Sequence, residues 1–267
     1  MKNPVFFVQN NYVERLTIPV AQFAHAHGYA LEDRSASTEF DPENCGIDWD
    51  QYGIVMPYGS VQFMRRLKES ARLGKYILHS EDAFSTAHWA DLLGDKAVNH
   101  RGRLIAAGEV PTLLAEGQAF HVRPDRQDKA FIAAVFDADS WEKEREKRNL
   151  DPELVCWASP VIVLKGEWRC WVIDGKIVEI SQYRKEGQAH RVLEADPAIH
   201  AAALSLAELY VPAPAVVMDI ALTEDGFQVL EFNPIHGSGW YAARVDVVLQ
   251  TWVTWALEYF TQQTDVS

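Results

Sequence analysis

The sequence predicts a mixed α/β and α+β protein, in which a lobe of alternating strands and helices precedes a larger part built from antiparallel hairpins. Apolar stretches alternate with amphipathic stretches up to about residue 90, which is typical of a βαβ arrangement. Strand-forming residues dominate from 155 to 187 and again from 216 to 234, and the turn signals Asp174-Gly175 and Glu224-Asp225-Gly226 indicate a hairpin in each stretch. We therefore expect two parts, residues 1–90 and residues 91–267.

The first part is predicted from apolar runs of strand length and from two segments with helical spacing. The helical segments each end at a glycine, Gly28 or Gly74, and span residues 15–28 and 61–74. The runs that we expect to form strands are residues 3–10, 29–35, 52–60 and 75–79.

The second part begins with a short predicted helix at residues 110–116 and two strands around a polar loop within 119–137. Residues 141–150 are a charge run that suits a solvated helix or a lid. Helical spacing returns at residues 195–212 and in the closing stretch 242–260.

Composition narrows the class of protein. Among 267 residues, 25 Lys and Arg face 38 Asp and Glu, and a formal charge of −13 argues against a general grip on nucleic acid or anionic lipid. No stretch approaches a membrane span, and the N-terminal residues lack a signal-peptide pattern. Three scattered cysteines favour reduced thiols, so we expect a cytoplasmic protein.

Two carboxylates and an amide interrupt the apolar run near the C-terminus. A three-residue loop at Glu224-Asp225-Gly226 pairs Asp219 with Glu231, and Asn233 shares their face because strand side chains alternate. The opposite face is apolar: Met218, Ile220, Leu222, Leu230 and Phe232. The acidic face either binds a divalent cation, Mg²⁺ or Mn²⁺ together with nucleotide phosphates, or belongs to an edge strand that meets water.

Basic side chains in or beside strands favour a site for a divalent cation and nucleotide over an edge strand that meets water. Arg123, Lys129, Arg169 and Arg184 each have a plain interpretation as surface cations, but together they would balance phosphate charge. Counting back from Asp174-Gly175 puts one polar set on a single face: Glu167, Arg169, Gln182 and Arg184. The other face then takes Trp168, Cys170, Val172, Ile177 and Tyr183.

Three motifs in order resemble the ATP-grasp superfamily. They are FHVRPD with KAF from Phe120 to Phe131, GEWRCWVIDGK from Gly166 to Lys176, and DIA followed by LEFN from Asp219 to Asn233. The sequence is most similar to a divergent phage and bacterial clade that is distinguished by two arginines and a lysine. No P-loop motif is present in the sequence.

This resemblance implies ATP held between two α+β lobes, with an N-terminal lobe that helps to hold the acceptor. It implies magnesium (or manganese) on Asp219, Glu231 and Asn233, phosphate contacts by Arg123 and Lys129, and catalysis by Lys129, Arg169 and Arg184. It also places Glu167 at the ribose hydroxyls. The segment expected at the adenine comprises Ser159, Val161, Ile162 and Val163.

The activity implied is that of an ATP- and magnesium-dependent ligase of the carboxylate-amine type, acting through an acylphosphate. Its partners would be a small-molecule or peptide carboxylate and a nucleophilic acceptor, not nucleic acid or membrane. Phosphoryl transfer to a hydroxyl and a non-catalytic nucleotide-binding module are the alternatives. The loop from Pro234 to Trp240 is either a flexible turn or a substrate contact through His236, Gly237, Ser238 and Gly239.

Overall fold

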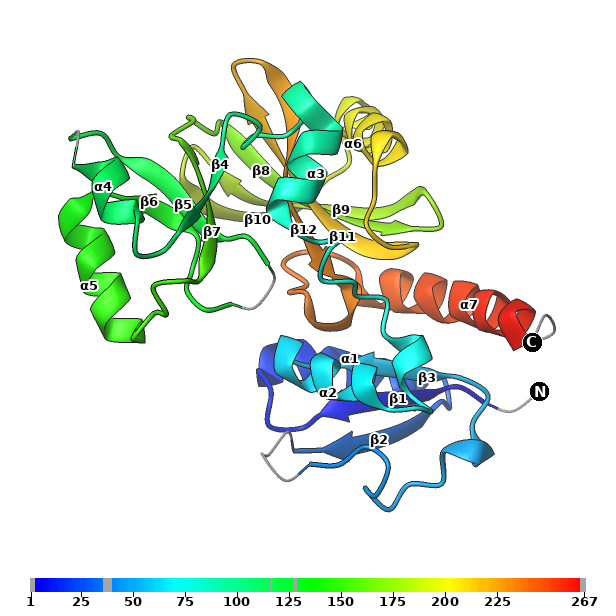
Figure 1. The fold of residues 1–267 in the computed structure, drawn as a ribbon. Helices are drawn as coiled ribbons and strands as arrows, with labels where there is room; N and C mark the ends of the chain where they lie inside the picture. The colour runs from blue at the N-terminus through cyan, green and yellow to red at the C-terminus, as the bar shows by residue number, and fades with distance from the viewer. Residues whose placement is uncertain (1–2, 36–39, 116, 127–128, 265–267) are drawn as a thin grey trace.

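The computed structural model describes residues 3–35, 40–115, 117–126 and 129–264, and within them three β-sheets are covered by seven α-helices (Figure 1). The helices are α1 (Glu14–Ala26), α2 (Val61–Glu69), α3 (Thr86–Leu93), α4 (Val110–Leu114), α5 (Ala138–Arg148), α6 (Pro197–Leu209) and α7 (Val245–Thr264). The predicted mixed α/β and α+β architecture is confirmed.

The N-terminal sheet is parallel, with strand order β2-β1-β3 (β1 Val5–Gln9, β2 Ala30–Arg34, β3 Val55–Tyr58). The predicted strand at residues 75–79 is wrong, and α2 ends five residues before Gly74. The reason lies in side chains that take up its backbone groups. Leu78 N donates to His236 Nε2 at 3.0 Å, and the carbonyl of Ile77 accepts from Lys68 Nζ at 3.2 Å, so neither group is free to join a ladder.

The central sheet is antiparallel, with strand order β10-β9-β8-β11-β12. Its strands are β8 (Gly166–Ile173), β9 (Lys176–Lys185), β10 (Gln188–Leu193), β11 (Ala215–Thr223) and β12 (Gly226–Pro234). Both hairpins turn near the predicted residues. Ile173 pairs with Lys176 as predicted, whereas Thr223 pairs with Gly226, which was predicted to lie in the loop.

A bulge in β12 changes part of the predicted register. Gly226 has φ +97° but pairs directly with Thr223, so the loop is one residue shorter than predicted. The register then shifts between Asp219 and Ile220, and this bulge restores the predicted pairing of Asp219 with Glu231. As a consequence Val229 replaces Leu230 in the apolar cluster, which corrects the predicted apolar face.

Two bulges in β9 likewise reverse part of a predicted face. Trp168 pairs with Gln182, whereas Tyr183 is passed over before Arg184 pairs with Glu167. Gln182 therefore leaves the face of Arg169, and Tyr183 takes its place beside the polar groups. The prediction was right for Glu167 and Arg184 because the second bulge restores the alternation that the first one breaks.

A smaller antiparallel sheet has strand order β4-β7-β5-β6 (β4 Arg103–Ala106, β5 Phe120–Pro124, β6 Ala134–Phe136, β7 Val155–Pro160). One face packs on α4 and α5 through Val122, Cys156 and Ala158. The alternate residues of β5 and β7 face the other way, and Trp157 joins the cluster under the central sheet.

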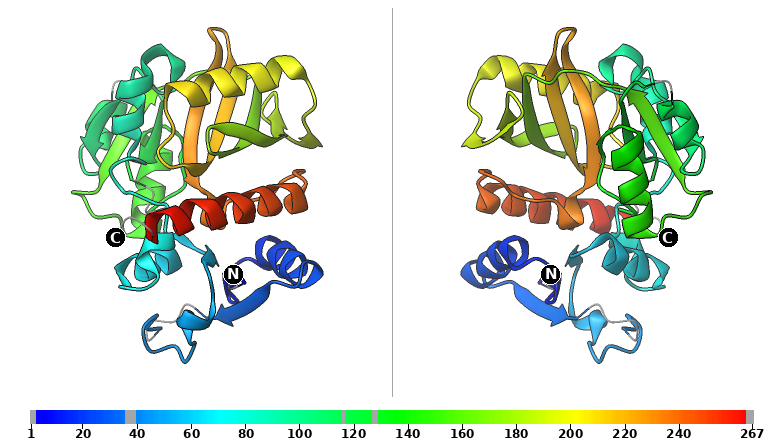
Figure 2. Two further views of the ribbon diagram at one scale, coloured as in Figure 1. Left: turned by 90° about the vertical axis from the view of Figure 1, so that its right-hand side faces the viewer. Right: turned by 90° about the vertical axis from the view of Figure 1, so that its left-hand side faces the viewer.

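The central sheet is buried on both faces, and this placement positions its polar side chains. On one face Cys170, Met218 and Phe232 pack with α3 and α6. On the other, Trp171 and Val217 share an apolar cluster with α7 and the N-terminal sheet, and Figure 2 shows α7 between the two sheets. Arg169 and Asp219 lie on the same face, two residues away from Trp171 and Val217 along these strands and outside the apolar cluster.

Candidate functional site

A buried ion pair lies at the centre of this uncovered face. Arg169 on β8 lies opposite Asp219 on β11, and its guanidinium donates from Nε to Oδ1 at 2.8 Å and from Nη2 to Oδ2 at 2.7 Å. A third bond runs from Nη1 to the carbonyl of Gly239 at 3.2 Å. Burial raises the pKa of Asp219 to about 7, and the charge of Arg169 opposes that rise.

Glu231, the second carboxylate, is held from the neighbouring sheet. Arg123 on β5 donates from Nη2 to Glu231 Oε2 at 3.0 Å and from Nη1 to the carbonyl of Leu230 at 3.3 Å. Asn233 donates to Glu231 Oε1 at 2.7 Å. Burial alone would raise the pKa of Glu231, but Arg123, Asn233 and Arg169 outweigh it and hold the value at about 2. Glu231 is therefore an anion at neutral pH.

These donors fit a hard divalent cation. Asp219, Glu231 and Asn233 carry carboxylate and amide oxygens. Asp219 Oδ2 accepts from both Arg169 and Asn233, whereas Asp219 Oδ1 and Glu231 Oε2 each accept one hydrogen bond and keep a further lone pair. Within the described residues, no group of three or more His, Cys, Asp and Glu side chains could hold a metal ion. Because Asp219, Glu231 and Asn233 offer oxygen ligands and neither thiolate nor imidazole, they suit magnesium, which is commonly bound by one or two carboxylates and completed by phosphate oxygens and water.

Three hollows meet beside this acidic pair, and each is lined by both Lys129 and Arg169. The broadest lies between the small and central sheets, where Arg123, Arg184, Asp219 and Glu231 also line it, so the structure brings the predicted basic and acidic residues together. Burial of its ammonium group lowers the pKa of Lys129, although the residue as a whole is exposed, and Glu231 opposes the shift. Its backbone has φ +54°.

The residues expected at the nucleoside lie farther along the same two sheets. Glu167 is buried and accepts from Arg184 Nη1 at 3.4 Å. Ser159 is buried and donates to Asn99 Oδ1 at 3.0 Å, so its hydroxyl is engaged within the protein. The next residues connect β7 to β8 without regular structure; there Val161 and Val163 are 47% and 72% exposed and Ile162 is half-buried.

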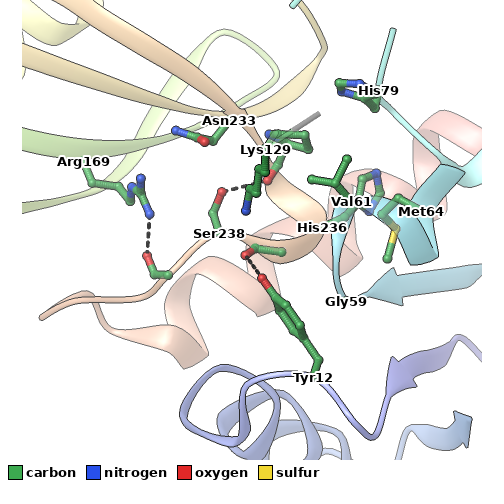
Figure 3. A pocket seen from close by; sticks show the side chains of 13 residues that line it. Tyr12, Gly59, Val61, Met64, His79, Lys129, Arg169, Asn233, His236 and Ser238 are labelled. Carbon is green, nitrogen blue, oxygen red and sulfur yellow. Dashed lines mark hydrogen bonds between the residues drawn. The ribbon is translucent and has the colours of Figure 1, made fainter. Parts of the chain in front are cut away.

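The loop after β12 lines a small pocket against the N-terminal lobe (Figure 3). Arg169 lies toward one end of it and Val61, Met64 and His79 toward the other, with Lys129 between them. The cavity has a volume of about 130 Å³. An apolar cavity of about 150 Å³ holds benzene, so this pocket matches a group of amino-acid size.

Contacts to the N-terminal lobe fix that loop in place. Tyr12 Oη donates to the carbonyl of Gly237 at 3.3 Å, and Tyr58 Oη donates to that of Ser238 at 2.8 Å. His236 is buried between Leu78 N, which donates to Nε2, and the carbonyl of Pro57, which lies 3.1 Å from Nδ1. His236, Gly237, Ser238 and Gly239 all line the pocket, and both ring nitrogens of His236 are engaged by backbone groups.

Sequence reasoning missed two tyrosines beside Arg169. The rings of Tyr183 and Tyr241 stack at 4.7 Å, and Arg169 Cζ lies 4.9 Å from the Tyr241 centroid and 6.0 Å from that of Tyr183. Counting residues from the Asp174-Gly175 turn placed Tyr183 on the apolar face, because such a count does not include the bulge at Tyr183. The only sequence signal for Tyr241 is its position directly after the loop from Pro234 to Trp240, which was expected near the substrate.

A comparison with known protein families identifies the type of domain. The family model described as "ATP-grasp domain, R2K clade family 3" matches residues 57–252. None of the curated proteins compared matches the sequence. No helix among the described residues is long and apolar enough to cross a membrane.

Several solved structures share the fold at low sequence identity. D-alanine–D-alanine ligase from Bacillus anthracis superposes with a TM-score of 0.63 at 13% identity, covering 98% of this chain and 100% of that one. D-cycloserine synthetase DcsG gives 0.61 at 16% identity, covering 94% and 99%. The ATP-grasp ligase PsnB, complexed with a minimal precursor, gives 0.51 at 16% identity, covering 87% and 91%.

Proposed function

The chain belongs to R2K clade family 3 of the ATP-grasp domains, and from this premise we propose that it is an ATP- and magnesium-dependent ligase that joins a carboxylate to an amine. The observation that carries the proposal is the paired arrangement of Arg169 with Asp219 and Arg123 with Glu231, at the meeting point of three hollows. Such an arrangement suits phosphoryl transfer, which depends on positioning and on balancing negative charge.

Each polar residue takes a role that follows from its place. Arg123, Lys129, Arg169 and Arg184 line the broad hollow and would bind the phosphates. Asp219, Glu231 and Asn233 would hold magnesium, which when bound neutralises phosphate charge and orients the nucleotide. Glu167 would accept the ribose hydroxyls, with Ser159, Val161, Ile162 and Val163 at the base.

The reaction then proceeds in two balanced steps. A substrate carboxylate oxygen bonds to the γ-phosphorus as the bond to ADP breaks, which gives an acylphosphate. The amine bonds to the acyl carbon, loses a proton, and phosphate departs. No protein nucleophile is needed, and the chain supplies donors that face the transferring group.

The small pocket is our candidate for one of the two substrates. It lies between the N-terminal lobe and the loop carrying Gly237, Ser238 and Gly239, and Arg169 and Lys129 also line it. The named neighbours support this class: one is a D-alanine–D-alanine ligase and another is a ligase bound to a precursor. We therefore propose an amino acid or peptide terminus as substrate.

The test is analysis of the products formed from ATP, magnesium and pooled amino acids and peptides. A ligase yields ADP, phosphate and a condensed product in equal amounts. A stable phosphorylated acceptor would instead indicate a kinase, and nucleotide binding without turnover of any pool would indicate a binding module. As a matched control, Arg169→Ala should lose turnover while retaining adenosine binding.

A further inference from the structure

Arg169 has two donors to spare, and their direction depends on how the guanidinium is held. Arginine has five N–H donors, and three of them bond to Asp219 Oδ1, Asp219 Oδ2 and the carbonyl of Gly239, which leaves two. Nη2 also lies 4.0 Å from Glu231 Oε1. Because Arg169 lines all three hollows, a small rotation of its guanidinium would change which hollow the remaining donors serve.

Tyr241 and Tyr183 form a stacked pair beside this guanidinium. The two rings are inclined by only 13°, and Arg169 Cζ lies 4.9 Å from the Tyr241 centroid. Arg191 Cζ lies 5.8 Å from the same ring. Neither tyrosine hydroxyl has a hydrogen-bond partner among the described residues. The rings, rather than the hydroxyls, therefore make the contacts that the structure records.

The backbone of Tyr241 is held in a conformation that a bulky residue rarely adopts. Its φ is +50°, in the left-handed region, where a tyrosine is strained. Neighbouring bonds on both sides enforce it: Trp240 Nε1 donates to the carbonyl of Leu16 at 3.0 Å, and Ala242 N donates to Ser181 Oγ at 3.1 Å. Glycine would relieve this strain, yet the sequence places an aromatic ring here.

We propose that Tyr241, supported by Tyr183, is a positioning residue that fixes the guanidinium of Arg169 so that its two remaining donors meet the γ-phosphate. A ring face attracts a guanidinium and also restricts its rotation, while Asp219 anchors its other edge. This inference rests on the proposed function, because it requires a nucleotide in the broad hollow.

The experiment compares the affinities of ADP and of the non-hydrolysable analogue AMP-PNP, both with magnesium, so that their ratio reports the γ-phosphate contact. Three variants are measured. Tyr241→Phe keeps the ring and loses the hydroxyl. Tyr241→Asn tolerates the left-handed backbone and loses the ring. Tyr183→Phe tests the second hydroxyl. Melting temperatures of all three check that the fold is retained.

We expect the AMP-PNP to ADP affinity ratio to fall at least tenfold in Tyr241→Asn, with ADP affinity little changed, and to stay within about twofold of wild type in both phenylalanine variants. An unchanged ratio in Tyr241→Asn would overturn the inference while leaving the nucleotide site intact. A loss in Tyr241→Phe equal to that in Tyr241→Asn would assign the effect to the hydroxyl. Failure of wild type to bind either nucleotide would overturn both the inference and the proposed function.

Discussion

At the scale of single residues, side chains with opposite charges determine the electrostatics of the site. The acidic pair Asp219 and Glu231 and the basic residues around it were predictable, because a carboxylate in an apolar strand needs a partner charge. Their pairing with individual arginines was not predictable, since Arg123 reaches Glu231 from another sheet, 108 residues away in the chain.

The buried imidazole of His236 gives a pH dependence at this scale. Burial lowers its pKa from 6.5 to about 4, so between these values the unfolded chain binds more protons than the folded one. The stability that neutral His236 contributes is thus complete above about pH 6.5 and is lost as the pH falls toward 4.

We expect His236→Gln to be less stable than wild type at neutral pH but to lose less stability between pH 6.5 and pH 4. Urea unfolding across that range measures both effects. His121, whose pKa burial also lowers to about 4, keeps part of the slope in the variant. Identical slopes for the two proteins would show that His236 does not titrate as described.

At the scale of elements, turns were predictable and bulges were not. A turn such as Asp174-Gly175 depends on local backbone preference, which the sequence carries. A bulge depends on how a strand meets both neighbours, and so Tyr183 and Leu230 were placed on the wrong faces. The predicted strand at residues 75–79 failed because the side chains of Lys68 and His236 bind its backbone groups.

The loop after β12 offers a matched pair of glycine substitutions. A Cβ on Gly237 would lie 2.2 Å from the carbonyl oxygen of Gly59, whereas one on Gly239 would meet nothing closer than Arg169 Nη1 at 3.6 Å. We expect Gly237→Ala to lower the free energy of unfolding by about 1–3 kcal/mol through overpacking.

Gly239→Ala should change the free energy of unfolding by less than about 0.5 kcal/mol. Denaturant unfolding of both variants measures the difference. Equal losses would mean that the loop does not press on the N-terminal lobe as tightly as Gly59 and Gly237 indicate.

At the scale of the whole molecule, the fold class and family followed from three motifs in order, and both are confirmed. The division at about residue 90 remains a proposal. One apolar cluster joins Phe7 and Val55 of the N-terminal sheet with Trp252 and Val253 of α7 and Trp171 of the central sheet. We propose that the N-terminal lobe depends on α7 for its core, which sequence periodicity alone could not reveal.

Trp252 tests that dependence because it is fully buried between the lobes. We expect Trp252→Ala to lower the free energy of unfolding by about 3–5 kcal/mol, as for other large core truncations. The matched control is Leu209→Ala on α6, whose side chain is 59% exposed and should cost less than about 0.5 kcal/mol. A small loss for Trp252→Ala would contradict a shared core.

Calorimetric titration of AMP-PNP into wild type and Glu231→Gln, with and without magnesium, is the most direct test of whether Glu231 belongs to a magnesium–nucleotide site. Glutamine keeps the shape of the side chain and removes its charge. We predict that magnesium tightens binding to wild type and that Glu231→Gln loses at least tenfold of that gain, equal to about 1.4 kcal/mol. The same magnesium-dependent affinity in both proteins, or no nucleotide binding by wild type, would contradict this role for Glu231.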